Sequence, residues 1–439
     1  MDATTDSYDC IVVGGGFAGL GTAWNLLRRG LRVLVLEAAA DLGGLVASYA
    51  FPTFRIEKFY HHFFPSDREL LTAIRDLGIS DRVVTVPGSV GYLVGGAVYP
   101  LNTPFEILRF PGLSFAGKVR LARLVRAART LDAAELERLD NVSAIDWIRS
   151  IGGEEVYMRF FAPLLKGKFG EAAPDISAAW LVARVRLRSG RSLRKGEMLC
   201  YFRGGFQDLV DALARDVVAR GDVRMGEPAA AIVVEHGMAA GVLTKTGHYR
   251  SRAVVAALTP PLLARLVAMP EEWVRTTGRI EFQACTCAVV GVRRSVLPIY
   301  WLNIDCEDLP FDVMLEHNNL MNSPDYDCRL LYLASYHSRP TDPLFCLPEE
   351  DLVEKYLHGL ERQFHWQRSD LLWWRVARAA QAGPIYRKGY LSAMPTHETP
   401  IHRLWHASMV HSFPERSVAD SFRQADVVAR LVASELRGQ

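Results

Sequence analysis

Three glycines near the start of the sequence have the spacing of a loop that binds a diphosphate. Gly14, Gly16 and Gly19 follow the pattern Gly-x-Gly-x-x-Gly. Gly14 permits a tight turn, Gly16 lets a diphosphate approach the backbone, and Gly19 lets a helix pack closely on a strand. Free N–H groups at the start of that helix would hold the phosphate charge. The pattern predicts a dinucleotide site, and a glycine-rich turn without a ligand is the alternative.

An acidic residue stands where the ribose of a dinucleotide is expected. Glu37 follows Gly14 by 23 residues and ends an apolar run. Its carboxylate is expected to accept hydrogen bonds from the ribose hydroxyls, and it would repel a 2′-phosphate, which disfavours NADP. These residues alone leave NAD and FAD open.

Two adjacent histidines are the first candidates for catalysis. His61 and His62 lie among four aromatic residues in the segment 57–64. A histidine beside a cofactor can hydrogen-bond cofactor or substrate, or carry a proton near neutral pH. A core histidine whose ring bonds to the backbone is the alternative.

Further titratable residues are scattered along the chain. Lys166 and Lys168 lie in a turn-rich segment, 163–170, where they could hold an anionic group or sit near a flavin; a solvated loop is the alternative. Tyr300 and Glu316, with the adjacent Trp301 and His317, are expected to line a substrate pocket or to pack in a core.

The elements that must position the glycine loop can be read directly. Residues 8–13 form an apolar run, residues 20–29 have helical spacing, and residues 32–36 form a second apolar run that ends at Glu37. Continuous apolar runs are typical of parallel strands buried on both faces. The sequence therefore predicts a complete βαβ unit, with Phe17 and Ala18 inside its loop.

A second glycine pair then follows, in the segment 38–45. This pair, Gly43 and Gly44, resembles that of the flavin-dependent amine oxidase and protoporphyrinogen oxidase superfamily. The resemblance implies FAD, because in that superfamily the pair lets the chain run close beside the flavin's ribityl and phosphate groups. It also implies cofactor contacts at Ala38, Leu45, Ala229, Asp420 and Ser421.

Later segments extend the resemblance over most of the chain. Residues 204–206, followed by a helix over 207–220, resemble the superfamily's return into the FAD domain, and 223–232 with 251–260 resemble its strand pair. The segment 57–64 resembles UDP-galactopyranose mutase and its relatives. The sequence departs from the pattern in two places. Ala39, Asp41 and Leu45 replace the usual arginines, and Ser408-Met409 replaces the usual Gly-Asp before a helix that starts near Asp420.

The resemblance implies an α/β fold, α+β overall. A Rossmann-like FAD-binding domain of the glutathione-reductase type is expected over 1–75, 196–260 and 376–439. A discontinuous mixed substrate domain is expected over 76–195 and 261–375, with strands at 282–292 and 330–335.

Composition narrows the class of protein. Hydrophobic residues make up 49% and charged residues 23%, and 51 Lys+Arg face 49 Asp+Glu, which disfavours nucleic acid as a partner. The first residues lack a signal-peptide pattern, and the seven cysteines are scattered, so a cytoplasmic enzyme without a metal site is expected.

One predicted helix is amphipathic and basic. Over 118–131, an apolar side is opposed by Lys118, Arg120, Arg123, Arg126 and Arg129. Peripheral contact with an anionic membrane is one interpretation, and a solvated face is the other.

Three functions follow from these features. The first is an FAD-dependent oxidase, dehydrogenase or desaturase that takes a hydride from a substrate C–H bond onto flavin N5. The second is a non-redox flavoenzyme that acts on a nucleotide sugar, as UDP-galactopyranose mutase does. The third is an inactive FAD-binding protein. The substrate is a small molecule, with sugar nucleotides, lipid-linked glycans, amines and polycyclic compounds all compatible.

Overall fold

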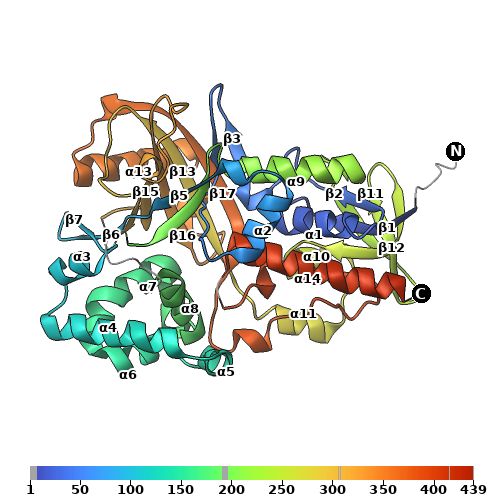
Figure 1. Ribbon diagram of the computed structural model, residues 1–439, viewed down its shortest axis with the longest axis horizontal. Helices are drawn as coiled ribbons and strands as arrows, with labels where there is room; N and C mark the ends of the chain where they lie inside the picture. The colour runs from blue at the N-terminus through green and yellow to red at the C-terminus, as the bar shows by residue number, and fades with distance from the viewer. Residues whose placement is uncertain (1–6, 190–195, 305, 307, 415, 439) are drawn as a thin grey trace.

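The structure, a computed structural model, describes residues 7–189, 196–304, 306, 308–414 and 416–438. Two large sheets and a group of helices make up this part of the chain (Figure 1). The first sheet and its covering helices lie at one end of the long axis, and the second sheet and the helical group lie at the other.

The first sheet contains the predicted βαβ unit. Strands β1 (Ser7–Val13) and β2 (Val33–Leu36) are parallel neighbours, joined through helix α1 (Phe17–Leu27). All four residues of β2 are buried, as the continuous apolar sequence predicts for a strand covered on both faces. The βαβ prediction is confirmed. The other strands of this sheet are β9 (Asp222–Arg224), β10 (Ala229–Glu235), β11 (Met238–Thr244), β12 (His248–Ala256) and β18 (Leu404–His406).

The order of these strands corrects one prediction. The order is β10-β11-β12-β1-β2-β9, with β18 beside β12. The segment 223–232 is therefore not one strand paired with 251–260: β9 and β10 lie at opposite ends of the sheet, and β11 separates β10 from β12. The segment 251–260 also ends as a strand at Ala256, and Pro260 begins helix α10 (Pro260–Leu266). A proline is well suited to the first turn of a helix, where its missing N–H costs no hydrogen bond.

Helices α9 (Gln207–Arg220) and α14 (Val418–Arg437) flank α1 (Figure 1). The helix predicted over 207–220 is confirmed. α14 begins at Val418, before the predicted start at Asp420, because the Ser417 hydroxyl accepts a hydrogen bond from the Asp420 amide at 3.0 Å and caps the helix.

The second sheet has the order β17-β13-β16-β15-β14-β6-β7 and is antiparallel except between β14 and β6. The strands predicted at 282–292 and 330–335 are confirmed as β13 and β16. β17 crosses the predicted domain boundary at 376 and stays in this sheet to Pro384. The bounds are β6 (Val90–Val94), β7 (Ala97–Pro100), β13 (Phe282–Val292), β14 (Trp301–Ile304), β15 (Val313–Glu316), β16 (Arg329–His337) and β17 (Leu371–Pro384).

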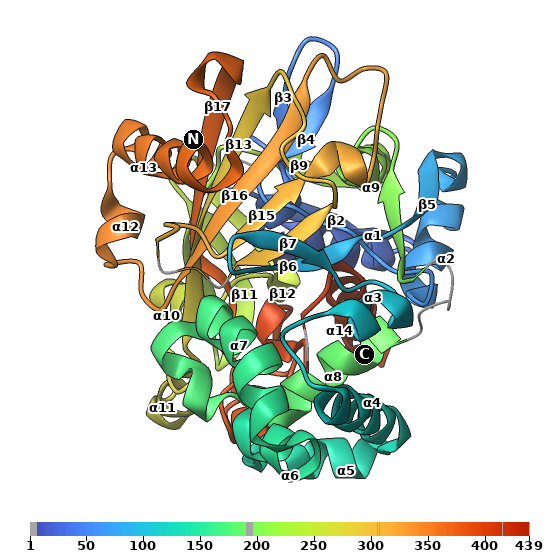
Figure 2. The same cartoon turned by 90° about the vertical axis from the view of Figure 1, so that its left-hand side faces the viewer.

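A group of helices lies beneath strands β6 and β7 of the second sheet (Figure 2). It comprises α3 (Pro104–Arg109), α4 (Phe115–Thr130), α5 (Ala133–Arg138), α6 (Ala144–Val156), α7 (Ala162–Phe169) and α8 (Ala178–Ser189). The helix predicted over 118–131 is confirmed as α4, whose buried side includes Leu121, Leu124 and Ala128.

The segment 163–170, predicted as turn-rich, is mostly helix α7. Pro163 falls in the first turn, where it is tolerated, and Leu165 and Phe169, four residues apart, are buried on one side. The two glycines and two lysines in this segment made the helical spacing of its apolar residues hard to recognise from the sequence.

The remaining elements are shorter or lie at the margins. They are α2 (Arg68–Asp76), α11 (Glu271–Thr277), α12 (Pro343–Cys346), α13 (Glu349–Phe364) and the strands β3 (Ser48–Ala50), β4 (Arg55–Glu57), β5 (Val83–Pro87) and β8 (Met198–Phe202). All seven cysteines are free. Among the described residues, no helix combines the length and the apolar character needed to cross a bilayer.

Candidate active site

The glycine loop and the second glycine pair line one cavity of about 510 Å³. Gly14, Gly16 and Gly19 come from the loop between β1 and α1, and Gly43 and Gly44 come from the segment after β2. The Gly43 amide donates to the Gly15 carbonyl at 2.9 Å, so the two segments lie side by side. Gly14 and Gly43 have φ values of +105° and +106°, which favour glycine.

The two loop glycines differ in what a side chain would meet. A Cβ at Gly19 would lie 1.8 Å from the Gly14 carbonyl oxygen, so this position must be glycine for the fold itself. A Cβ at Gly16 would meet only the Gly44 Cα, at 3.9 Å. The fold does not require glycine at 16, whereas close approach by a ligand in the cavity would.

Glu37 lies at the end of β2 and lines the same cavity. Its carboxylate accepts hydrogen bonds from the Gly15 amide at 2.5 Å and from the Ala39 amide at 2.7 Å. These bonds fix the side chain, and a carboxylate has further lone pairs for hydroxyl donors.

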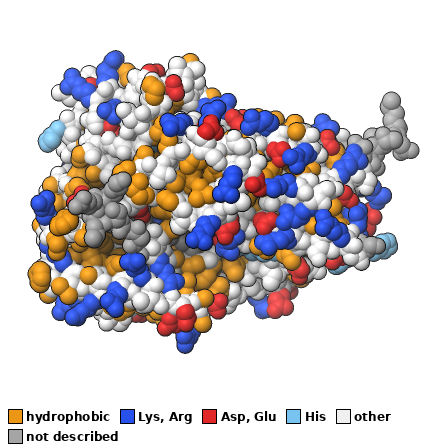
Figure 3. All heavy atoms as spheres, in the orientation of Figure 1, with side chains coloured by type: hydrophobic (Ala, Val, Ile, Leu, Met, Phe, Trp, Pro, Cys, Tyr) orange, Lys and Arg blue, Asp and Glu red, His pale blue; other side chains and the backbone are white. Residues whose placement is uncertain are grey.

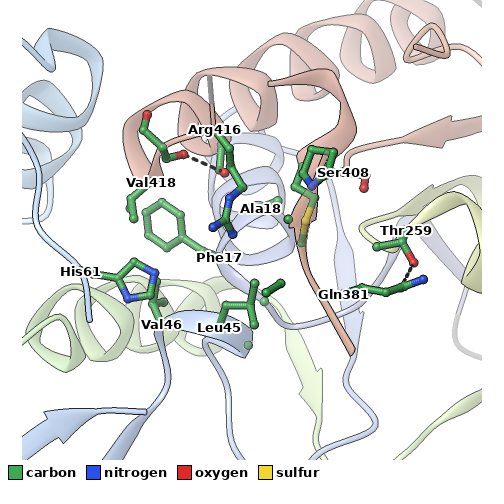
Figure 4. Close-up of a pocket in the computed structure, with 18 of the residues that line it drawn as sticks. Phe17, Ala18, Leu45, Val46, His61, Thr259, Gln381, Ser408, Arg416 and Val418 are labelled. Atoms are coloured by element: carbon green, nitrogen blue, oxygen red, sulfur yellow. Dashed lines mark hydrogen bonds between the residues drawn. The ribbon is translucent and has the colours of Figure 1, made fainter. Parts of the chain in front are cut away.

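The start of α14 closes the cavity on the opposite side. Ser408, Met409, Ser417 and Ser421 line it, and Arg416 points into it from just before α14 (Figure 4). Sequence reasoning missed Arg416. The available signal was a basic residue directly before the Ser417 cap. Asp420 is not among the lining residues, and its Oδ1 instead accepts a hydrogen bond from Arg423 at 2.9 Å.

His61 faces Arg416 across the cavity (Figure 4). Burial, and then the charge of Arg416, lower the pKa of His61 to about 4, so the ring is neutral near pH 7. Its Nδ1 lies 2.7 Å from the Phe59 carbonyl, which can only accept, so Nδ1 carries the proton. Nε2 is therefore a hydrogen-bond acceptor.

His62 also lines the cavity, within a group of aromatic rings. Its ring lies edge-on to Tyr300 and Trp301, and its Nδ1 is 3.5 Å from the Tyr300 hydroxyl. Tyr300 itself is buried behind His62 rather than in the cavity wall. Nearby, the Tyr60 and Tyr336 hydroxyls share a short hydrogen bond.

A second cavity of about 700 Å³ adjoins the first. Lys168, Trp180, Arg184, Trp301 and Tyr336 line both. The rest of its wall is mainly apolar and comes from the helical group and the second sheet. Representative side chains are Leu101, Ile107, Leu121, Val125, Leu164 and Leu181.

Of the two lysines predicted to take part in the site, only Lys168 lines the cavities. Lys168 lies where the cavities meet, with its Nζ 5.5–5.8 Å from the ring centroids of Phe169, Trp180 and Tyr336. Lys166 is exposed and is not among the residues that line either cavity.

Three other predicted residues lie outside both cavities. Glu316 is fully buried, and its Oε2 accepts hydrogen bonds from the Val296 and Leu297 amides at 2.8 and 2.7 Å, so it holds a loop rather than lining a pocket. Ala38 is exposed beside Glu37. Ala229 begins β10, close to Glu227, whose amide donates to the Glu37 carbonyl at 2.9 Å.

Asp312 is a titratable residue of the second cavity that the sequence did not indicate. Its Oδ2 accepts a hydrogen bond from the Tyr336 amide at 2.8 Å. Burial raises the pKa of Asp312 to about 7, partly opposed by that hydrogen bond. A carboxyl that titrates near neutral pH therefore lies in a largely apolar wall.

Some relatives of this chain are described as flavin-containing oxidases. A flavin-containing monoamine oxidase of Mycobacterium tuberculosis is 25% identical over 263 residues, 58% of this chain and 57% of the relative. The chain thus spans little more than half the length of that relative.

Solved structures of the same fold cover nearly the whole chain. A structure described as a protoporphyrinogen oxidase of Exiguobacterium matches 97% of this chain and 98% of its own, with a TM-score of 0.78 and 17% identity. A reduced UDP-galactopyranose mutase matches 98% of this chain and 96% of its own, with a TM-score of 0.76 and 18% identity. These likenesses confirm the expected fold class.

The model of the family described as flavin containing amine oxidoreductase matches residues 17–433, nearly the whole chain. The chain belongs to this family of flavin-dependent amine oxidoreductases, and its cofactor is accordingly a flavin, FAD.

Proposed function

We propose that the chain binds FAD in the glycine-lined cavity and oxidises a largely apolar small molecule bound in the adjoining cavity. The observation that carries this proposal is the shared wall: Lys168, Trp180, Arg184, Trp301 and Tyr336 line both spaces. A cofactor and a substrate in these two cavities would meet at that wall. Pockets at such junctions are common sites of catalysis.

The residues present suit FAD. Gly14, Gly16 and the start of α1 offer bare amides to the diphosphate, and Glu37 offers a fixed carboxylate to the ribose. Gly43 and Gly44 keep side chains out of the space beside the loop. Arg416 supplies the positive charge that the missing arginines around the glycine pair do not. We assign Phe17, Ala18, Leu45 and Ser421 to the same site.

These contacts support the discontinuous domain division proposed from the sequence. Residues 1–75, 196–260 and 376–439 are assigned to FAD binding, and 76–195 and 261–375 to the substrate. The start of the last segment, up to Pro384, lies in the second sheet and contributes Gln381 and Gly383 to the FAD cavity.

A bound flavin supplies a two-electron acceptor for a hydride from a substrate C–H bond. The chain's own part is to position that bond and exclude water. Trp180, Trp301 and Tyr336 form an aromatic wall that can orient an apolar substrate. We assign hydrogen-bonding or proton-transfer roles at the cofactor's edge to His61, His62 and Lys168, with neutral His61 as an acceptor through Nε2. Tyr300 supports His62 from behind.

The alternatives are less well supported. A nucleotide sugar carries many polar groups and two phosphates, and the second cavity has a mainly apolar wall in which most of these groups would lose hydrogen bonds. An inactive FAD-binding protein would have no need of the second cavity. We place the enzyme in the cytoplasm, with a small-molecule substrate as its partner and peripheral membrane contact through 118–131.

Two measurements test the function. The purified protein is expected to be yellow, with an oxidised flavin spectrum, and anaerobic addition of an apolar substrate is expected to bleach it. A colourless protein that ignores added FAD would refute the proposal. Turnover of a nucleotide sugar only after dithionite reduction would favour the mutase-like alternative instead.

A further inference from the structure

The second cavity opens at the surface between α3 and α4. Leu108, Phe115 and Val119 line this cavity and are also 54%, 76% and 39% exposed, so they lie at its mouth. Phe105, which is 65% exposed, precedes Leu108 by three residues and lies on the same side of α3. Large apolar side chains gathered at one opening mark a contact surface, whereas isolated ones do not.

Basic side chains share this opening. Lys118 and Arg129 line the cavity with the apolar residues, and Arg126 continues the stripe that runs from Phe115 through Val119 along α4. The segment 104–130 contains six basic residues and one acidic residue, Glu106. The Glu106 carboxylate is held by the Asn102 and Thr103 amides, both at 2.7 Å. Figure 3 shows hydrophobic and basic side chains side by side over this part of the molecule.

The wall of the second cavity is mainly apolar between the mouth and the proposed reaction site, where Lys168 and Arg184 also line it. Ala122 and Val125 follow Val119 along the cavity wall, and Trp301 and Tyr336 lie at its inner end, where the two cavities meet. A molecule that moves inward along the apolar part of this wall would stay in contact with apolar side chains until it reaches the junction of the two cavities. Entry from lipid would therefore avoid the cost of first dissolving an apolar substrate in water.

We propose that one surface, the portal rim, docks on an anionic lipid bilayer, and that an apolar substrate enters the second cavity from the lipid. The portal rim consists of Phe105, Leu108, Phe115, Val119, Lys118 and Arg126. Apolar side chains can enter the region between headgroups and acyl chains while the basic groups contact lipid phosphates. The entry step rests on the proposed oxidation in the second cavity. The docking step does not rest on that oxidation, and it extends the membrane contact proposed for 118–131.

Vesicle sedimentation tests the docking. The flavin-loaded full chain is expected to bind phosphatidylcholine–phosphatidylglycerol vesicles at least about tenfold more tightly than phosphatidylcholine vesicles, because each basic residue near an anionic surface contributes about 1 kcal/mol. Phe115→Asp is expected to weaken this binding at least about tenfold. Val218→Asp, on α9, is the matched control, because Val218 is also an exposed apolar residue, at 59%.

The results separate docking from function. The docking proposal would be overturned if the wild-type protein stayed in solution with anionic vesicles. It would also be overturned if Phe115→Asp left the binding unchanged, or if Val218→Asp weakened the binding as much as Phe115→Asp does. Each of these results would favour a protein partner or none. Flavin content, measured by absorbance on the same samples, reports on the proposed function alone. A yellow protein that does not bind vesicles would contradict the docking proposal alone. A colourless protein that binds them would contradict the proposed function alone.

Entry has its own readout, the uptake of the apolar dye Nile red from the same vesicles. Ala122→Trp is expected to slow dye transfer into the cavity several-fold, because Ala122 is an exposed residue of the cavity wall. Vesicle binding should be no weaker than that of the wild type, because a tryptophan on this stripe itself favours the membrane interface. Transfer at the wild-type rate would refute entry through this opening.

Discussion

At the residue scale, Gly16 separates what the fold needs from what a cofactor needs. Gly16→Val is expected to fold, because a Cβ at this position meets no atom closer than 3.9 Å. It is expected to weaken FAD binding at least about a hundredfold, about 2.7 kcal/mol, because the side chain would occupy the space for the diphosphate. The measurement is the ratio of flavin to protein absorbance after purification with added FAD.

A control for this change lies in the turn between β11 and β12. A Cβ at Gly247 meets no atom within 4 Å, so Gly247→Val makes the same chemical change away from the cavity. It should keep its flavin. A stably folded Gly16→Val protein that is as yellow as this control would contradict the site.

Asp312 predicts a pH dependence in the second cavity. Below its pKa of about 7 the carboxyl is neutral, and above it the carboxylate is charged and disfavours an apolar ligand in contact with it. Nile red affinity is therefore expected to fall several-fold as pH rises from 6 to 8, roughly one unit either side of that pKa. Asp312→Asn, which stays neutral, should bind the dye equally across this range. A sloping profile in the variant would assign the titration to another group.

At the scale of elements, the sequence predicted those whose patterns are local. The β1–α1–β2 unit, α9, α4 and β13 each carry a continuous apolar run or a clear helical spacing, and each was found where expected. The wrong predictions concern features that are set by contacts with segments distant in the sequence. Nothing local in 223–232 shows that β9 and β10 lie at opposite ends of the sheet, because strand order is set by packing over long sequence separations.

The residues of the candidate site also fall into two groups, those that the sequence could locate and those that only the fold brings together. The glycines and Glu37 could be located because a diphosphate and a ribose need particular residue types at fixed spacing. Arg416, Asp312 and the aromatic wall come from separate elements that meet only in the folded chain. Glu316 was misplaced for the same reason, since its carboxylate turns away from the cavities to hold the Val296 and Leu297 amides.

The start of α14 carries a prediction of its own. Ser417→Ala removes the hydroxyl that accepts from the Asp420 amide, and it is expected to cost about 1 kcal/mol of unfolding free energy. Ser417→Asn should restore most of that loss, because asparagine caps helices well. Urea unfolding of the three flavin-free proteins measures both effects. Equal stability of Ser417→Ala and wild type would show that the cap contributes nothing.

At the scale of the whole molecule, three histidines join the first sheet to the segment that closes the glycine-lined cavity. The His411 ring stacks on the His397 ring and lies edge-on to the His406 ring. It also bonds to the backbone of Ser408, which lines the cavity. His406 lies in β18 and bonds through Nε2 to the Leu258 carbonyl at 2.7 Å. Burial lowers the pKa of His406 to about 4 and that of His411 well below its usual value, so both are neutral in the fold.

This arrangement gives stability a defined dependence on pH. Between about 6.5, the pKa of an unfolded histidine, and about 4, the unfolded chain binds a proton at position 406 that the folded chain does not, so this residue destabilises the fold as pH falls. The pKa of Asp312 is raised in the fold, so Asp312 stabilises the fold as pH falls. The pH dependence of the wild-type unfolding free energy therefore contains contributions of both signs. The comparison of wild type with His406→Gln isolates the contribution of this histidine to the pH dependence.

As pH falls from about 6.5 to about 4, the free energy of unfolding of the variant should decrease less steeply than that of the wild type. The two slopes should differ by up to about 1.4 kcal/mol per pH unit. Parallel curves for the two proteins over this range would show that His406 is protonated equally in the folded and unfolded chains.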